Sequence, residues 1–367
     1  MSEGRIYNFA AGPSMLPLEV LKRAQSELLN YEGNGMSIME MSHRSAAFQK
    51  VFDEAKAKFK EIMNVPDSHE VLFLQGGASS QFSAVPLNFL GDKGKATYAI
   101  TGNFSNIACK EAKKYGEIQV AYDGSDNGFR HIPAMDELDV DGNSSYFHYC
   151  DNNTIYGTEW SYVPKVNVPL ICDMSSNICS KEVDISKYAC IYAGAQKNLS
   201  PAGLTVVIVD KRMLGHKRSI TPLMMDYELM VKKDSMYNTP PCFNIYMLGL
   251  MMDWIKEQGG LKAMEERRKL RASILYDVLD NSKIYKGHAD KDSRSCMNVT
   301  FRTLNDEMDR EFIEGAKCKG LVNLKGHRLT GGIRASIYNS MPVEGVELLR
   351  DYMKEFECKA GISYLSF

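Results

Sequence analysis

The sequence predicts an α/β protein built around a doubly wound, mostly parallel sheet. Short apolar runs with strand character recur from residue 70 to residue 209, and stretches with helical spacing lie between them. Strands that alternate with helices of ten or more residues are typical of parallel sheets. With 367 residues, the chain also exceeds a usual single domain. We therefore expect a large domain over 16–260, a smaller α/β domain over 261–367, and an N-terminal segment, 1–15, that joins them.

The expected elements of the large domain follow the chain in order. Helical spacing covers 17–29 and, more regularly, 45–63, where one helix face is apolar. The apolar positions of that face are Phe48, Val51, Phe52, Ala55, Phe59, Ile62 and Met63. Strands are predicted at 70–74, 96–100, 118–121, 145–149, 170–173, 190–193 and 204–209. The glycine pair at 76–77 opens another helix directly after the first strand.

The composition changes after Trp254, where the smaller domain is expected to begin. Gly259 and Gly260 end one helix, and a charged helix is predicted over 262–280. Strands are expected near 297–301 and 332–337. A terminal helix follows, with an apolar stripe made of Val346, Leu349, Met353 and Phe356. Such a stripe indicates core packing and no ligand site.

Composition excludes several function classes. A hydrophobic share of 44%, a charged share of 25% and a net charge of −2 offer no electrostatic attraction to nucleic acid or to an anionic membrane. The first residues lack a basic-then-apolar signal pattern, and no apolar run reaches membrane-spanning length. Nine scattered cysteines without a C-x-x-C pair indicate neither a disulfide framework nor a zinc cluster. We expect a cytoplasmic protein without a bound metal.

Lys197 is the first candidate for catalysis. It lies in a turn-rich segment of small residues between the apolar runs 188–193 and 204–209, with Gln196 as a polar neighbour. A lysine between two buried strands loses hydration, which lowers its pKa and makes a neutral, nucleophilic amine accessible. A Schiff-base lysine needs this property. The segment alone leaves a solvated turn lysine as an equal alternative.

Asp173 favours the catalytic reading of Lys197. It ends the predicted strand 170–173, and ligands of open parallel sheets bind beyond the carboxyl ends of the strands. Pyridoxal phosphate (PLP) needs a carboxylate against its ring nitrogen, because the protonated ring is the electron sink for a carbanion at the substrate α-carbon. Asp173 and Lys197 fit two neighbouring strand ends of one sheet. The alternative is a helix-capping aspartate and a surface lysine.

Motifs along nearly the whole chain resemble the phosphoserine aminotransferase family, within the class V group of PLP enzymes. These motifs lie at 7–17, 41–44, 75–82, 192–204, 236–241 and 326–339, and the last is the most specific. The resemblance implies the fold-type I architecture of PLP-dependent transferases. It also implies that PLP is the cofactor, joined to Lys197 and held at its ring nitrogen by Asp173.

The resemblance assigns further residues to the cofactor. Its phosphate is held by Ala78 and Ser79 at a strand–glycine–helix junction, a type of turn that suits phosphate, together with Gln196. Asn238 and Thr239 reach the same phosphate from a neighbouring subunit, so the family implies a homodimer with shared active sites. By itself, the glycine junction indicates only a tight turn.

Two more cofactor contacts follow from the resemblance. Phe104 occupies the position where relatives often stack a tryptophan on the ring, and its smaller ring predicts weaker cofactor binding. Thr154 matches a threonine that hydrogen-bonds near the phenolic oxygen. Without the family, Phe104 reads as ordinary core packing and Thr154 as a turn residue.

Basic residues are the candidates for substrate binding. Arg334 begins an alternating run in which Arg334, Ser336 and Tyr338 share one strand face. An arginine fork matches a carboxylate or a phosphate, and a substrate that carries both needs several such donors. The resemblance assigns Arg334 to the α-carboxylate. It places His43, Arg44, His327 and Arg328 around the substrate phosphate or the distal carboxylate of glutamate.

Two points leave these substrate assignments open. Some bacterial relatives carry an arginine at the position of Ser79, so the strength of phosphate binding here is open. Each His-Arg pair also reads as a solvated loop pair when it is considered alone.

The reaction implied by the family is a transamination between small molecules. L-glutamate gives its amino group and leaves as 2-oxoglutarate, and 3-phosphohydroxypyruvate becomes O-phospho-L-serine, a step of serine biosynthesis. Lys197 then acts as the general base at the α-carbon. The phosphorylated four-carbon keto acid of pyridoxine biosynthesis, which leads to 4-phosphohydroxy-L-threonine, remains a second possible substrate.

Other functions fit the sequence less well. A serine or alanine:glyoxylate aminotransferase would not need the His-Arg pairs, and a cysteine desulfurase would need a cysteine in a flexible, electropositive stretch. A nucleotide-binding protein is suggested by 91–95, but Phe89 and Ala96 break the phosphate-loop pattern. A non-catalytic binding protein on the same scaffold would not need both Lys197 and Asp173.

Overall fold

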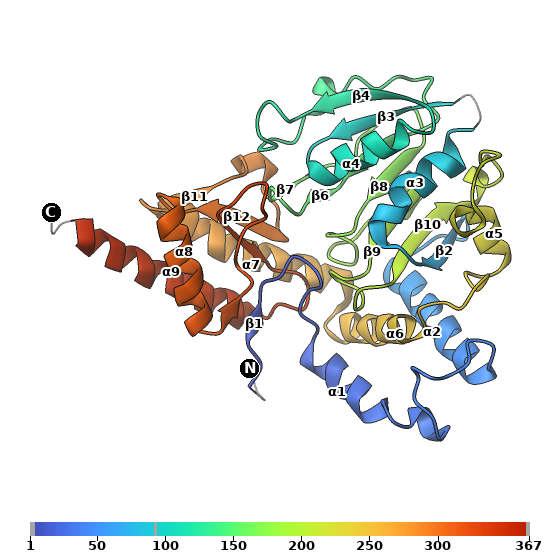
Figure 1. Cartoon of the computed structure of the whole chain (residues 1–367), viewed down its shortest axis with the longest axis horizontal. Helices are drawn as coiled ribbons and strands as arrows, with labels where there is room; N and C mark the ends of the chain where they lie inside the picture. The colour runs from blue at the N-terminus through green and yellow to red at the C-terminus, as the bar shows by residue number, and fades with distance from the viewer. Residues whose placement is uncertain (1–3, 92–93, 365–367) are drawn as a thin grey trace.

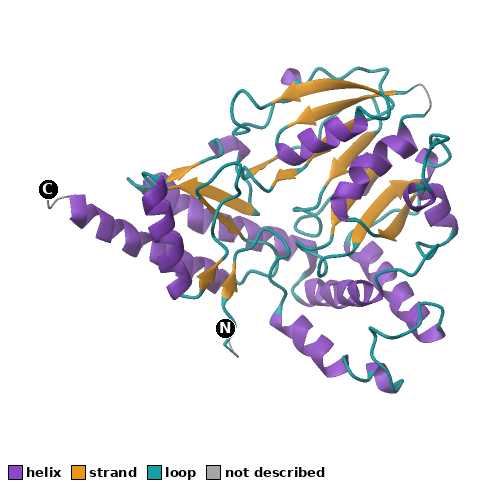
Figure 2. Cartoon of the chain, viewed as in Figure 1, coloured by secondary structure: helices purple, strands orange, loops and turns teal. Residues whose placement is uncertain are grey.

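A computed structural model of the chain describes residues 4–91 and 94–364, so Asp92 and Lys93 of the rejected phosphate-loop segment lie outside it. A seven-stranded sheet with the order β2-β10-β9-β8-β5-β3-β4 forms its centre (Figures 1 and 2). Its strands are β2 (His69–Leu74), β3 (Lys95–Ile100), β4 (Glu117–Asp123), β5 (Phe147–Cys150), β8 (Leu170–Asp173), β9 (Cys190–Gly194) and β10 (Thr205–Asp210). All seven predicted strands are present, with ends within two residues of the prediction.

The expected mostly parallel sheet is confirmed, with one strand that runs the other way. Strand β10 pairs antiparallel with both β9 and β2, whereas the remaining pairs are parallel. Because β2 and β9 each oppose β10, they run in the same direction. The carboxyl ends of β2, β9, β8, β5 and β3 therefore meet at one edge of the sheet.

The prediction that helices of ten or more residues separate the strands is wrong for part of the sheet. Helices α3 (Gly77–Phe89) and α4 (Asn103–Ala112) fill the first two crossovers, but β8 and β9 are joined by turns and a short 3₁₀ helix. In that connection Asn177 N donates to Met174 O at 2.9 Å, and Ser180 Oγ donates to Asn177 O at 2.7 Å. Such local hydrogen bonds compete with a helix.

Helices cover both faces of the sheet (Figure 2). Helices α1 (Leu18–Glu27), α2 (Ala46–Ile62) and α6 (Cys242–Glu257) pack on one face, and α3, α4 and α5 (Tyr227–Lys232) pack on the other. Strand β10 shows the alternation: Val206 and Ile208 join the first core, and Val207 and Val209 join the second. The predicted helix at 45–63 is confirmed, with Ser45 as its N-cap.

The C-terminal part has its own sheet and hydrophobic core. It contains α7 (Gly260–Asn281), β11 (Lys286–Gly287), β12 (Asn298–Arg302), α8 (Asp306–Cys318), β13 (Leu321–Val322), β14 (Ile333–Ser336) and α9 (Val343–Tyr364). Strands β11, β12 and β14 form an antiparallel sheet, and β1 (Tyr7–Asn8) pairs parallel with β13. Helix α7 begins at the predicted boundary, although the division into domains stays a prediction. No described helix combines the length and apolar character that crossing a membrane requires.

A buried ion pair connects the two parts of the chain. Glu159 belongs to the short hairpin of β6 (Asn152–Asn153) and β7 (Thr158–Glu159), and Arg268 lies on α7. The Arg268 guanidinium donates to Glu159 Oε1, Lys181 Nζ lies 3.3 Å from the same oxygen, and Cys296 N donates to Oε2 at 3.0 Å. Burial raises the pKa of Glu159, but the Arg268 and Lys181 charges outweigh it and hold this pKa below its usual range.

We expect Glu159→Gln to lower the free energy of unfolding by about 3–5 kcal/mol, because Arg268 would keep a buried charge without its counter-ion. The matched control is Glu265→Gln on α7, whose partner Lys269 has 64% of its side chain exposed. The control should cost less than about 1 kcal/mol. Urea denaturation followed by circular dichroism measures both. Equal losses in the two variants would contradict the prediction.

Candidate active site

The candidate residues gather at the edge where the parallel strands end. Asp173 is the last residue of β8, and Lys197 lies in the turn between β9 and β10. The others at this edge are Ala78 and Ser79 after β2, Phe104 after β3, Thr154 after β5 and Gln196 beside Lys197. Residues that are far apart in the chain thus share one edge, as the carboxyl-end rule predicts.

The Lys197 amine is desolvated. Its Nζ donates to Thr154 Oγ1 at 2.7 Å and lies 5.9 Å from the centre of the Phe104 ring. Burial lowers the pKa of Lys197 to about 8, although the nearby Asp173 carboxylate acts in the opposite direction. The expectation of a desolvated lysine is confirmed, and the solvated turn lysine is excluded.

Asp173 presents a carboxylate that is held on one side. Its Oδ1 accepts from Ser175 N at 3.0 Å and from Ser175 Oγ at 2.6 Å, and Ser175 Oγ accepts from Gly194 N at 3.0 Å. Oδ2 accepts no hydrogen bond from the described residues. Burial raises the pKa of Asp173 above its usual value, and the Ser175 hydrogen bonds and the Lys197 charge only partly offset this shift. The helix-capping alternative fails, because turns follow this residue.

The start of α3 offers free backbone donors. Gly76 is its N-cap with a φ of 90°, and no side chain caps the helix. The amides of the first turn, which includes Ala78 and Ser79, have no carbonyl partner within the helix. A residue with a Cβ at position 76 would approach Ser80 Oγ to 1.9 Å, so glycine is needed here.

These groups together can hold a flat ring with an anionic tail. Phe104 is 38% exposed and lies at the start of α4, so its ring is available for stacking and the core-packing alternative is wrong. Asp173 has a free carboxylate oxygen for a cationic ring nitrogen, and Lys197 has an amine for an aldehyde. The uncapped start of α3 suits a phosphate.

Arg334, which belongs to β14, lies on the side of the site where Lys197 is bound to Thr154. Its Nη1 donates to the main-chain oxygen of Thr154 at 3.3 Å, while Lys197 donates to the hydroxyl of the same threonine. Arg334 is therefore on the correct side of the site to bind a carboxylate next to the amine.

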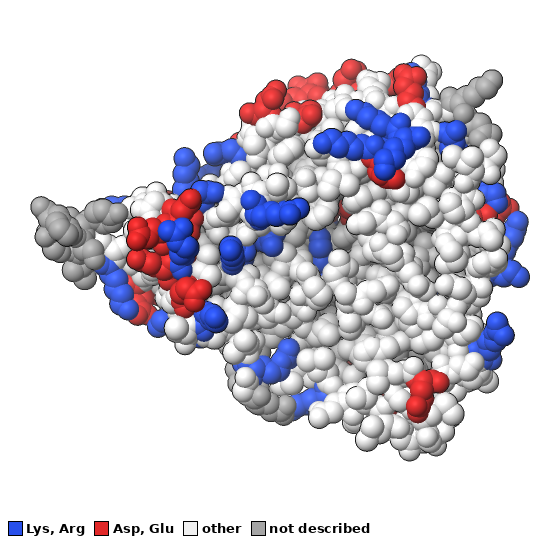
Figure 3. All heavy atoms as spheres, viewed as in Figure 1, with Lys and Arg blue, Asp and Glu red and all other residues white. Residues whose placement is uncertain are grey.

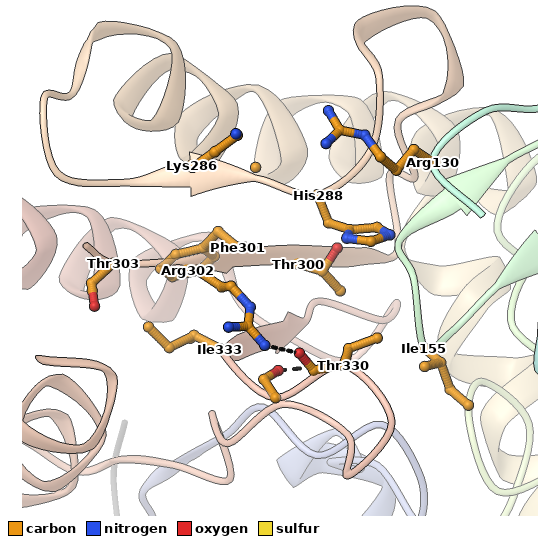
Figure 4. A pocket seen from close by; sticks show the side chains of 12 residues that line it. Arg130, Ile155, Lys286, His288, Thr300, Phe301, Arg302, Thr303, Thr330 and Ile333 are labelled. Carbon is orange, nitrogen blue, oxygen red and sulfur yellow. Dashed lines mark hydrogen bonds between the residues drawn. The ribbon is translucent and has the colours of Figure 1, made fainter. Parts of the chain in front are cut away.

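His327 and Arg328 lie near Arg334, on the loop that precedes β14. Burial lowers the pKa of His327, and the charges of Arg334 and Arg328 lower it further. The Arg302 guanidinium holds this loop through the carbonyl of Thr330 (Figure 4). Arg328 itself is exposed.

Four predicted site residues are not brought to Lys197 within this chain. His43 and Arg44 precede α2 and make no hydrogen bond or ion pair with Lys197, Thr154 or Arg334 in the described structure, and Arg44 is exposed. Asn238 and Thr239 precede α6, where Thr239 O accepts from Gln75 Nε2 at 3.0 Å. Their expected contact with a neighbouring subunit stays a prediction.

The N-terminal segment makes contacts that the sequence analysis missed. Ser14 N donates to Gln196 O at 2.9 Å, and Ser14 Oγ donates to the carbonyl of Lys197. Tyr338 Oη donates to Ala11 O at 2.8 Å. The motif at 7–17 contributes to the family resemblance, and it was the available signal for this contact. The sequence analysis gave its residues no part in the Lys197 site.

Comparisons with known proteins agree with this arrangement. The aminotransferase class-V family model matches residues 6–349. A phosphoserine aminotransferase of Bacillus cereus is 52% identical over 354 residues, which cover 96% of this chain and 98% of that protein.

Solved structures show the same fold. The phosphoserine aminotransferase of Bacillus circulans subsp. alkalophilus matches with a TM-score of 0.95 and 44% identity, over 98% of this chain and 100% of that one. The PLP-bound phosphoserine aminotransferase of Trichomonas vaginalis matches with a TM-score of 0.92 and 38% identity, over 95% and 100%. The predicted fold-type I architecture is thereby confirmed. The chain belongs to the class-V aminotransferases and, within them, to the phosphoserine aminotransferase family.

Proposed function

We propose that this chain is a PLP-dependent aminotransferase. It transfers the amino group of L-glutamate to 3-phosphohydroxypyruvate and yields 2-oxoglutarate and O-phospho-L-serine. Family membership supports the reaction class. The observation that carries the proposal is the desolvated Lys197 amine, whose pKa is about 8, between Thr154 and Phe104 and near Asp173.

The cofactor would be held by groups from five strand ends. The first turn of α3, with Ala78 and Ser79, and Gln196 would hold the phosphate, and Phe104 would stack on the ring. Asp173 would bind the ring nitrogen, and Thr154 would lie near the phenolic oxygen. When bound, PLP supplies an electron sink for the negative charge that develops at the substrate α-carbon.

Lys197 serves as the base that moves the α-proton. A neutral amine can accept a proton, and a pKa near 8 makes both protonation states accessible near neutral pH. The hydrogen bond from Nζ to Thr154 Oγ1 fixes the direction of the amine. Burial thus supplies the desolvation of the amine, and Thr154 supplies its orientation.

Asp173 is the carboxylate that would bind the cationic ring nitrogen. The Ser175 hydrogen bonds stabilise the ionised carboxylate, and Gly194 N in turn orients the Ser175 hydroxyl. The carboxylate is therefore held in place through Oδ1, and Oδ2 is left for the ring nitrogen. A charge held in this way stabilises a developing positive charge without reorganisation.

Substrate binding would use the basic residues around Arg334. Arg334 would bind the α-carboxylate next to Lys197, and His327 with Arg328 would bind the distal phosphate or carboxylate. His43 and Arg44 make no hydrogen bond or ion pair with this group in the described chain, and we propose that they reach the phosphate in a second copy. With Asn238 and Thr239, they support a homodimer with shared active sites, and we keep the cytoplasm as its predicted location.

A coupled assay with glutamate tests the proposed reaction and the role of Lys197. The native protein should convert 3-phosphohydroxypyruvate, and a parallel arm offers the phosphorylated four-carbon keto acid. Lys197→Ala should lower kcat by about 10⁴-fold or more, because the proton carrier is removed. The exposed Lys187→Ala should react normally. Steady-state transamination by Lys197→Ala would remove this lysine from the mechanism.

Asp173→Asn tests the charge at the ring nitrogen. The variant keeps its shape and should still bind PLP, as measured by its visible absorbance. Its kcat should fall by about 10²-fold or more, since the loss of one preorganised electrostatic group has this effect. Near-normal turnover of PLP-loaded Asp173→Asn would be incompatible with the assigned role.

The pKa of Lys197 can be measured in cofactor-free protein by acetic anhydride labelling. The neutral amine is the reactive form, and a lowered pKa makes this form abundant at a lower pH. The labelling rate of Lys197 should therefore rise through a midpoint near pH 8 and then level off. Peptide mass spectrometry gives the rate, with exposed Lys262 as the internal reference. A rate that still rises at the ordinary lysine pKa of 10.5 would exclude desolvation.

A further inference from the structure

A cavity outside the Lys197 site is lined by basic side chains. It has a volume of about 250 Å³ and lies between β11, β12 and the loop before β14 (Figure 4). Its basic side chains are Arg130, Lys286, His288 and Arg302, and its described lining contains no aspartate or glutamate. Figure 4 shows these side chains arranged around one space, with His288 between Arg130 and Arg302.

The positive charge in this cavity is only partly balanced. Arg130 lies 3.2 Å from Asp290, and both side chains are more than 40% exposed. Arg302 lies 3.3 Å from Asp306, whose side chain is 77% exposed. Exposed ion pairs of this kind are weak and screened by salt. Lys286 makes no ion pair with any residue in the described ranges.

His288 lies within reach of the positive charges of Arg130 and Arg302. Its Nε2 hydrogen-bonds to Gly128 O at 2.9 Å. Burial lowers the pKa of His288, and the charges of Arg130 and Arg302 lower it further. Two guanidinium groups from different segments therefore act on one point of the cavity wall. Figure 3 shows Lys and Arg side chains on this face of the molecule, where its two parts meet.

We propose that this cavity is a second anion site, which binds a small dianion of the phosphate type. Guanidinium forks match phosphate oxygens, and an ammonium group adds a point charge. Arg130, Lys286 and Arg302 come from three segments and supply more positive charge than one carboxylate needs. The proposal rests on this lining and does not depend on the reaction at Lys197.

The proposed site is separate from the Lys197 site but shares a wall with it. Thr330 and Gly331 line the cavity and belong to the loop that carries His327 and Arg328. Arg302 contacts the cavity and also holds this loop through Thr330 O. An anion bound by Arg302 would therefore lie directly behind the loop.

Calorimetric titration of the PLP-loaded protein with inorganic phosphate, at constant ionic strength, tests the proposal. We expect Arg130→Gln/Lys286→Gln to bind phosphate at least about tenfold more weakly, because two charge-assisted contacts are lost. The matched control is Lys283→Gln/Arg310→Gln, which removes the same charge from exposed positions outside the cavity. The control should change the affinity less than about threefold. Melting curves verify that all variants are folded.

Two further arms identify the place and the source of the anion. Arg328→Gln removes a proposed phosphate ligand of the Lys197 site and should leave phosphate binding at the cavity intact. Glycerol 2-phosphate replaces inorganic phosphate in the second arm. Tighter binding of the ester identifies phosphate esters as ligands, and tighter binding of phosphate identifies the free ion.

Three results would overturn the proposal. The first is an unchanged affinity in Arg130→Gln/Lys286→Gln, and the second is the absence of phosphate binding by the native protein. The third is binding that is lost in Arg328→Gln but kept in the cavity variant, because the anion would then occupy the Lys197 site. None of these results depends on transamination, so they remain distinct from a failure of the proposed function.

Discussion

The site depends on the burial of one amine at the edge where the parallel strands end. A buried amine has lost its hydration, so it needs hydrogen-bond partners from the protein at fixed positions. The Lys197 side chain is bound by Thr154, and its carbonyl accepts from Ser14. The next residue, Asn198, accepts from Asn339 N at 3.1 Å through Oδ1. The turn is thus fixed by the large sheet, the N-terminal segment and the chain after β14.

These contacts also set the position of Arg334 relative to Lys197. The chain after β14 is bound to the connection between β8 and β9 through Asn339, whose Nδ2 donates to Cys179 O at 2.7 Å. The N-terminal segment pairs with β13 through β1 and then crosses the lysine turn. The contacts of Asn339 and those of the N-terminal segment therefore both join the part of the chain that carries Lys197 to the part that carries Arg334. A carboxylate anchor and a proton carrier need such a fixed distance to act on one substrate.

Local sequence signals predicted the strands and the candidate residues Asp173 and Lys197. They did not predict the contacts between segments that are far apart in the chain. Asp173 and Lys197 stood out because periodicity and turn residues are read over a few positions. The direction of β10 was not predictable, since its apolar run reads the same for a parallel and an antiparallel strand. Ser14 contacts Lys197 across 183 positions, and Arg130 meets His288 from a distant segment. Spacing along the chain carries no information on such pairs.

Burial acts differently on the two basic side chains that Thr154 holds. It lowers the pKa of Lys197 to about 8, and it also lowers the pKa of Arg334. The pKa of a free lysine ammonium group is near 10.5, so this shift brings proton release close to neutral pH. The pKa of a guanidinium group starts much higher, so the group keeps its charge. A lysine at position 334 would be at risk of losing its charge under the same burial. An arginine at position 197 could not release a proton. Thr154 therefore binds two basic side chains with different tasks. Lys197 must exchange protons and Arg334 must stay charged, so neither residue can replace the other.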